Sequence, residues 1–147
     1  RWLQTLLDAR LLSGEQARAV DPRKIAAFCE SELYARMRSA RRLWREMPFS
    51  FSLPAEEVYA DMPEGREAAG EAVLVQGVID CLFEEEDGLV LVDYKTDAEK
   101  GRGWEAAAGE HRFQIETYGA AIGRILGRPV KEGYVWFVEG GLAVRIF

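Results

Sequence analysis

Apolar side chains recur at spacings of three and four along residues 2–46, which predicts a run of helices. Residues 13–16 (Ser-Gly-Glu-Gln) have the pattern of a capping box, and Asp-Pro at 21–22 combines a favoured N-cap residue with a favoured first helical residue. From there we expect a longer helix with an interruption around Ser39. Met-Pro at 47–48 ends the helical region.

Beyond residue 48 the pattern changes to short, strongly apolar runs, which are typical of β-strands. Strands are expected at residues 49–53, 72–83, 89–95, 130–138 and 142–147. The run at 72–83 is apolar on both faces, which suggests a central strand.

The remaining segments connect these strands. We expect a loop or hairpin tip at 63–67, a hairpin turn at 84–88 with Asp-Gly as its signal, and a helix at 104–126 with a break near Gly109. This order of elements predicts an α/β fold, a mixed sheet flanked by helices with a helical N-terminal segment.

The 147 residues have the size of one domain, which we divide into a helical segment at 1–46 and an α/β core at 47–147. Hydrophobic residues make up 48% and charged residues 30%, the balance of a soluble globular chain without a membrane-spanning run. Cys29 and Cys81 are expected to be buried, reduced thiols. Because the first residue is Arg1, we expect the chain to be cut from a longer polypeptide.

The net charge of −6 by itself disfavours nucleic-acid binding, because contacts to phosphates need Lys and Arg. The arginines are clustered, however, at positions 36, 38, 41, 42 and 45. They form either a solvated helix face or a track for a DNA backbone. A carboxylate site that holds a divalent metal does not present its bare negative charge to a phosphate.

Ionisable side chains stand inside two apolar strands, where an isolated charge is costly. Asp93 and Lys95 are two residues apart and therefore point to the same face of their strand. A four-residue hairpin loop would place Asp80 opposite Asp93, and a two-residue loop would place it opposite Lys95. In either register two carboxylates and one ammonium converge within roughly 5 Å.

This constellation suits phosphodiester hydrolysis. Two close carboxylates repel each other when both are ionised, and Mg²⁺ or Mn²⁺ relieves that repulsion. The metal polarises a phosphoryl oxygen and lowers the pKa of a bound water, while a lysine orients that water or stabilises charge on the phosphate. A buried structural ion network is the alternative interpretation of Asp80, Asp93 and Lys95. Glu46 precedes the first strand and is left without an assigned role.

Three short motifs occur in order on the expected elements: GVID at 77–80, DYKT at 93–96 and Gln114-x-x-x-Tyr118 on the next helix. With the phrases REMPFS (45–50) and RPVKEGYVWF (128–137), they resemble the RecB-type branch of the PD-(D/E)xK nuclease superfamily. The chain is most similar to the C-terminal nuclease domain of the AddA subunit of bacterial AddAB helicase–nucleases. The resemblance covers roughly the whole chain.

The resemblance implies a role for each matching residue. Asp80 and Asp93 would ligate Mg²⁺ or Mn²⁺ together with the backbone carbonyl of Tyr94, and Lys95 would be the catalytic lysine. Gln114 and Tyr118 would support the site and contact DNA. Members of this branch also carry a metal-ligating histidine on an earlier helix, which we expect before Arg1; His111, in the wrong element, is expected to be an exposed helix residue.

The resemblance implies a deoxyribonuclease, expected to be an exonuclease, within an ATP-dependent helicase–nuclease that acts in double-strand-break repair and recombination in the bacterial cytoplasm. A motor would deliver single-stranded DNA, an AddB-like protein would be the partner, and ATP would be used outside this chain, which contains no P-loop. The alternatives are a non-catalytic DNA-binding or subunit-docking module and a stand-alone RecB- or Cas4-like exonuclease. An iron–sulfur cluster would need more cysteines than two.

Overall fold

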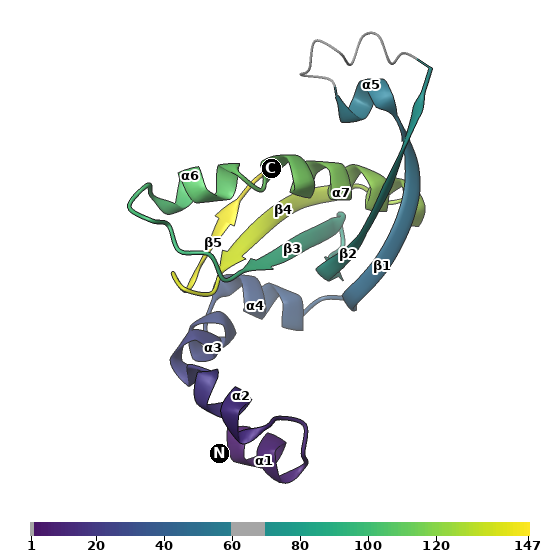
Figure 1. Ribbon diagram of the computed structural model, residues 1–147. Coiled ribbons are helices and arrows are strands. Elements are labelled where there is room, and N and C mark those ends of the chain that lie inside the picture. Colours follow the sequence, from purple (N-terminus) through teal and green to yellow (C-terminus); the bar gives the residue numbers. More distant parts are fainter. Residues whose placement is uncertain (1, 60–69) are drawn as a thin grey trace.

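The computed structural model describes residues 2–59 and 70–147, and these residues form one sheet with helices on both of its faces (Figure 1). The strand order is β1-β2-β3-β4-β5, and the mixed α/β fold expected from the sequence is confirmed. Only the β3–β4 pair is parallel among these neighbours. The strands are β1 Arg42–Pro54, β2 Ala72–Glu84, β3 Leu89–Lys95, β4 Val130–Phe137 and β5 Leu142–Arg145.

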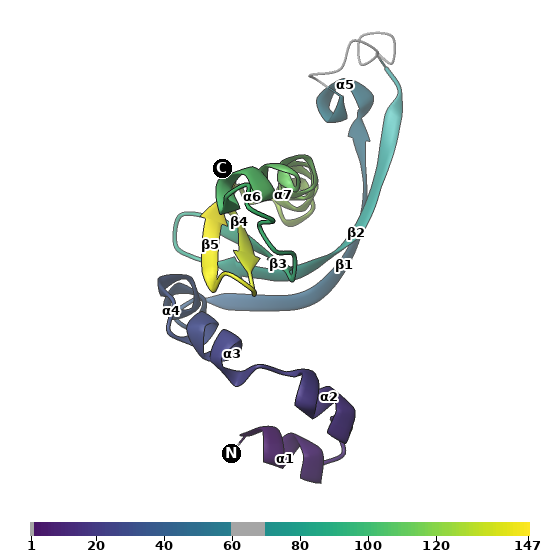
Figure 2. The same ribbon diagram turned by 60° about the vertical axis from the view of Figure 1, so that its left-hand side comes forward.

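The helices before the sheet form a chain in which α4 lies against the sheet and α2 and α1 extend away from it (Figures 1 and 2). They are α1 Trp2–Asp8, α2 Gly14–Ala19, α3 Pro22–Cys29 and α4 Glu32–Arg38. The capping box at Ser13 and the N-cap at Asp21 are both confirmed. The expected long helix is wrong, because it is divided at Ser31, whose hydroxyl accepts from the backbone N–H of Tyr34 and starts α4.

The first strand begins earlier than the sequence predicted. Residues 42–46 were expected to be helical, but β1 starts at Arg42 and pairs with β2 from there. Trp44 and Met47 are spaced like helix residues, yet both pack on the core from a strand. A short unforeseen helix, α5 at Ala55–Val58, follows β1, and the loop expected at 63–67 lies outside the described residues.

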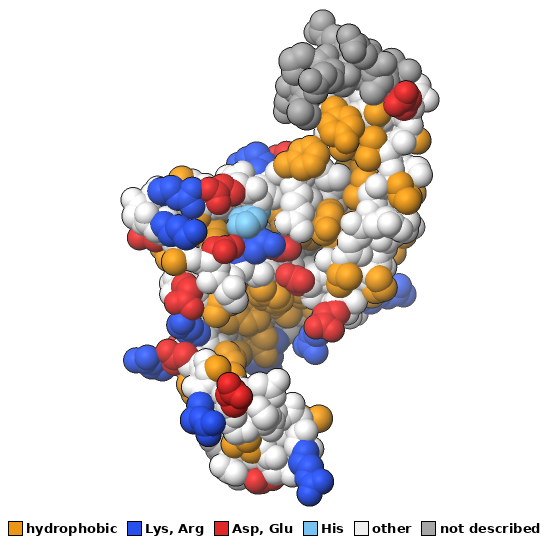
Figure 3. All heavy atoms as spheres, in the orientation of Figure 1, with side chains coloured by type: hydrophobic (Ala, Val, Ile, Leu, Met, Phe, Trp, Pro, Cys, Tyr) orange, Lys and Arg blue, Asp and Glu red, His pale blue; other side chains and the backbone are white. Residues whose placement is uncertain are grey.

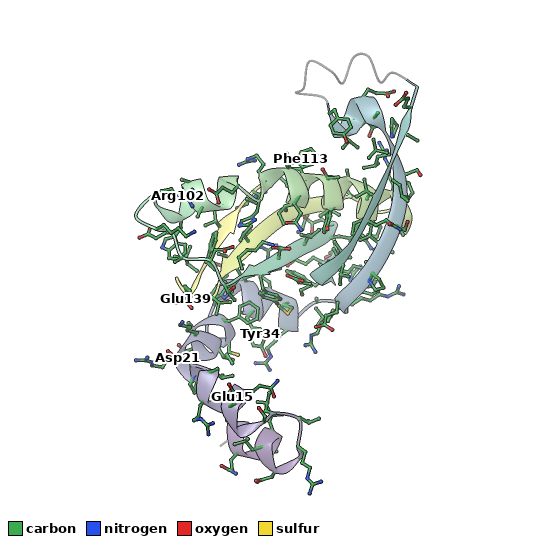
Figure 4. All side chains as sticks on the ribbon, viewed as in Figure 1. Glu15, Asp21, Tyr34, Arg102, Phe113 and Glu139 are labelled. Carbon is green, nitrogen blue, oxygen red and sulfur yellow. The ribbon has the colours of Figure 1, made fainter. Side chains whose placement is uncertain are left out.

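Two layers of apolar side chains cover the sheet. On one face, α7 (Arg112–Leu126) buries Ile115 and Ile122 against β2, β3 and β4. Truncating either isoleucine to Ala would cost about 2–5 kcal/mol. On the other face, Leu33 and Met37 of α4 pack against the opposite side of the same strands. The outer side of α7 is open to solvent, where Phe113 is exposed (Figure 4).

Of the remaining expectations, the structure confirms one and corrects two. The helix at 104–126 is broken as expected, into α6 (Trp104–Gly109) and α7. Strand β2 is interior but not buried throughout, since Leu74 and Val78 are exposed where the β1–β2 ribbon leaves the sheet. Cys81 is buried, whereas Cys29 is exposed, which corrects the expectation for that thiol. None of the helices in the described ranges is long and apolar enough to span a membrane.

Arg36 fastens α4 to the sheet and is not part of a solvated helix face. Its guanidinium donates to both carboxylate oxygens of Glu85 at 2.9 Å. It also donates to one carboxylate oxygen of Glu132 at 2.8 Å. These hydrogen bonds lower the pKa of Glu85 to about 2. Lys131 also pairs with Glu85, at 2.6 Å. The ion network thus joins α4, the β2–β3 hairpin and β4.

Candidate active site

Strands β2 and β3 part at Asp80, and this fork is where the candidate site lies. Their pairing runs from Glu84↔Leu89 to Cys81↔Val92, so the four-residue loop register is the one adopted. One step further, Oδ2 of Asp80 accepts a 2.9 Å hydrogen bond from the backbone N–H of Tyr94. A side-chain carboxylate thus satisfies a backbone donor at the end of the ladder.

The neighbouring strand β1 is distorted at the same level. Glu46 has a φ of +49°, and the β1–β2 pairing omits it between Arg45↔Cys81 and Met47↔Ile79. Ile79 belongs to the core on the α7 side, but Cys81 belongs to the core on the α4 side. Both strands therefore change their inward face here without a change of register, and a cavity lies beside Asp80 at this level.

Asp93 is the buried acid of the site, with only 5% of its surface exposed. Its Oδ2 lies 2.7 Å from Nζ of Lys95, but this ion pair lacks hydrogen-bond geometry, so Oδ2 has no hydrogen-bond partner among the described residues. Burial raises the pKa of Asp93 and the Asp80 charge adds to this, while Lys95 opposes it. An ionisable acid that is buried and incompletely partnered is typical of a functional site.

Helix α7 brings Gln114 and Tyr118 to the strands on one face, as expected from their spacing. Oε1 of Gln114 lies 3.5 Å from Nζ of Lys95. Tyr118 packs edge-on against Phe49. A Cβ atom added to Gly77 would lie only 2.3 Å from the Tyr118 hydroxyl oxygen. Gly77 is therefore required by the close approach of Tyr118 to strand β2.

His111 is partly buried beside the site and is not the exposed helix residue that the sequence suggested. Its Nε2 lies 3.6 Å from Oδ2 of Asp97, and its ring packs near Phe137. It stands just before α7, as the N-cap. Acidic and basic side chains gather around the histidine on this face of the molecule (Figure 3).

A cavity of about 550 Å³ opens at the fork and is lined by Arg45, Glu46, Asp80 and Tyr94. Glu46 was not assigned a role from the sequence. A sequence signal could have identified it. Trp44 and Met47 both face the core but are three residues apart, which breaks the two-residue alternation of a strand. The backbone distortion at Glu46 lies between them. Glu46 and Asp80 thus present two carboxylates to one cavity.

The oxygen atoms at the fork suit a hard divalent cation. Asp80 on β2 and Asp93 on β3 supply carboxylates, and Tyr94, which follows Asp93, adds a backbone carbonyl. Within the described part of the chain, no three His, Cys, Asp or Glu residues come close enough to form a complete ligand cluster. The unpartnered Oδ2 of Asp93 nevertheless fits a metal ligand, and Mg²⁺ ordinarily binds through one or two carboxylates and retains several waters.

Comparison with known proteins identifies the family to which the chain belongs. The chain is 42% identical over 144 residues to an ATP-dependent helicase/nuclease subunit of Desulforamulus reducens, a match that covers 98% of the chain and 11% of that protein. It is 45% identical over 148 residues to the corresponding subunit of Geobacillus kaustophilus, a match that covers 96% of the chain and 12% of that protein. The resemblance to AddA is confirmed, and the chain spans about a tenth of the length of these curated relatives.

The family model described as the PD-(D/E)XK nuclease superfamily matches residues 1–144. That range includes the fork, the Asp93–Lys95 pair and the supporting helix α7. The chain therefore belongs to the PD-(D/E)XK nuclease superfamily.

Proposed function

We propose that the fork between β2 and β3 is the active centre of a metal-dependent deoxyribonuclease. The observation that carries the proposal is the buried Asp93, which lies 2.7 Å from Lys95 and on the strand whose backbone Asp80 caps. Both carboxylates and the Tyr94 carbonyl would hold Mg²⁺ or Mn²⁺. When bound, the metal would polarise a phosphoryl oxygen and lower the pKa of a water ligand.

The protein's own groups would orient the reaction around that position. Lys95 would turn its ammonium toward the attacking water or toward the charge that builds up on the phosphate. Gln114 would restrict Lys95, because its Oε1 is within 3.5 Å of the ammonium. Tyr118, held between Phe49 and Gly77, would fix the distance of α7 from the strands and present a hydroxyl near bound DNA.

We infer the biological setting from the names of the relatives. An ATP-dependent helicase/nuclease would unwind DNA with a motor and pass a single strand to this domain. ATP would be hydrolysed outside these 147 residues, and an AddB-like protein would be the partner. The activity would be exonucleolytic and serve double-strand-break repair and recombination in the bacterial cytoplasm.

The test is cleavage of end-labelled single-stranded DNA by the full-length protein with Mg²⁺ or Mn²⁺. The wild type should cut, and EDTA should abolish cutting. Asp93→Ala and Lys95→Ala should lower the rate by about 10²-fold or more. Asp97→Ala is the matched control, since Asp97 lies two residues beyond Lys95 and is largely exposed. Cleavage that survives in Asp93→Ala would favour a structural ion network and a non-catalytic module.

A further inference from the structure

Arg45 lies at the edge of the fork and contributes to the same cavity as Glu46, Asp80 and Tyr94. It is exposed on β1, opposite Cys81 of β2. Arg45 therefore stands at the wall of the cavity, on the strand next to the one that carries Asp80.

Unlike Arg36, Arg41 and Arg42, Arg45 has no acidic partner among the described residues, and unlike the equally unpaired Arg38 it lines the cavity. Arg36 binds Glu85 and Glu132, and Arg42 lies 3.8 Å from Glu84. No residue in the described ranges forms an ion pair or a hydrogen bond with the side chain of Arg45. An exposed guanidinium beside a carboxylate-lined cavity, without a protein partner, is free to bind an anion.

The charges around the fork indicate why a bound phosphate would require the positive charge of Arg45. Glu46, Asp80 and Asp93 carry three negative charges, and Lys95 compensates one of them. A divalent cation would neutralise the other two and leave the phosphodiester's own charge uncompensated. Arg45 supplies the missing positive charge at the cavity wall.

We propose that Arg45 binds a backbone phosphate of the single DNA strand next to the phosphate that is cleaved. The planar guanidinium forms two parallel hydrogen bonds to phosphate oxygens and so sets the register of the strand over the fork. Arg45 acts on the position of the strand, and the metal ligands and Lys95 remain separate from it. This inference rests on the proposed nuclease function.

The first test measures DNA binding without cleavage, in full-length protein with Ca²⁺ in place of Mg²⁺. Fluorescence anisotropy with a labelled single-stranded oligonucleotide gives the dissociation constant over a series of salt concentrations. Arg45→Gln should weaken binding about ten-fold and reduce the slope of log K against log salt by about 0.7, the value for one lost single-strand phosphate contact. Arg45→Lys should keep most of the slope.

Arg42→Gln is the matched control. Arg42 lies three residues earlier on β1, is also exposed, and loses the same charge, but it does not line the cavity. It should change binding less than two-fold. Equal losses in Arg42→Gln and Arg45→Gln would mean that only general surface charge matters, and an unchanged salt slope in Arg45→Gln would likewise overturn the proposal.

A second test locates the contact by replacing single phosphates near the cut with neutral methylphosphonates. With Mg²⁺, the wild type should lose about ten-fold in kcat/KM at one neighbouring position, and Arg45→Gln should be insensitive at that position only. The concentration of Mn²⁺ that gives half-maximal rate should be the same in both proteins. Sensitivity at every position in both proteins would contradict the assignment. Failure of the nuclease function itself would be seen separately, as undiminished cleavage by Asp93→Ala.

Discussion

The carboxylate of Asp80 accepts a hydrogen bond of 2.9 Å from the backbone N–H of Tyr94, at the point where β2 and β3 separate. A ladder hydrogen bond is thus replaced by a side chain, and the strands part without leaving this donor unsatisfied. The same contact orients Asp80 toward the strand that carries Asp93 and Lys95. The divergence of the strands and the geometry of the candidate site therefore have one structural cause.

Asp93→Asn should stabilise the metal-free protein at neutral and alkaline pH. Burial raises the pKa of Asp93 above its ordinary value of 3.8. A raised folded-state pKa contributes stability that is complete below the unfolded value and is lost as the pH rises through the folded value. We expect the variant's Tm to exceed that of the wild type by a few degrees at pH 8 and to match it near pH 3.5.

The measurement is thermal unfolding in EDTA over this pH range, with Asp97→Asn as an exposed control. Added Mg²⁺ should raise the Tm of the wild type but not of Asp93→Asn, because ligand binding to the native state stabilises it. A lower Tm for Asp93→Asn at pH 8 would mean that Asp93 serves mainly as the partner of Lys95.

Gln114 should act through Lys95. Removing its amide in Gln114→Ala frees the ammonium from a contact at 3.5 Å, and we expect the cleavage rate to fall about ten-fold. Because two groups that act as a unit are not additive, the double variant with Lys95→Ala should be no slower than Lys95→Ala alone. A further ten-fold loss in the double variant would show that Gln114 acts independently of Lys95.

Gly77→Ala should destabilise the domain and displace α7. Its Cβ would lie 2.3 Å from the hydroxyl and 2.5 Å from the ring of Tyr118, which itself packs on Phe49. Overpacking of this kind costs about 1–3 kcal/mol, which corresponds to roughly 2–4 °C in Tm per kcal/mol for a domain of this size. Thermal unfolding gives the measurement.

Gly109→Ala is the control for that substitution, since no neighbouring atom lies within 4 Å of the added Cβ, and its Tm should not fall. Combining Gly77→Ala with Tyr118→Ala should restore part of the stability lost in Gly77→Ala. If the double variant lost the sum of both effects, the contact between Gly77 and Tyr118 would not be the cause.

Arg36→Gln should weaken the attachment of α4 in a pH-dependent way. Arg36, with a smaller contribution from Lys131, holds the pKa of Glu85 at about 2, below its ordinary value of 4.5, so this stabilisation is present above pH 4.5 and is lost as the pH falls toward 2. After solvent screening we expect a loss on the order of 1 kcal/mol at pH 7 and little difference at pH 2.5. Tm values at both pH values test this, with the exposed Arg23→Gln as control; an equal loss at both would contradict it.

The sequence allowed much of the fold and the centre of the site to be predicted. Periodicity identified the strands, and the hairpin length brought Asp80 to the Asp93–Lys95 strand because register follows from turn geometry. The start of β1 was missed, because Trp44 and Met47 have helical spacing but are separated by the distortion at Glu46. Partners far apart in sequence, such as Arg36 with Glu132, follow from tertiary packing and leave no local signal.

The most direct measurement is anomalous diffraction from crystals of the protein that carries this domain, grown with Mn²⁺. We predict a peak at the fork, about 2.1 Å from carboxylate oxygens of Asp80 and Asp93 and from the carbonyl oxygen of Tyr94, with a distance typical of a small hard cation. The peak should disappear in Asp93→Ala. A Mn²⁺ ion bound elsewhere, with the fork empty and Asp93 still paired only with Lys95, would contradict the assignment of this site.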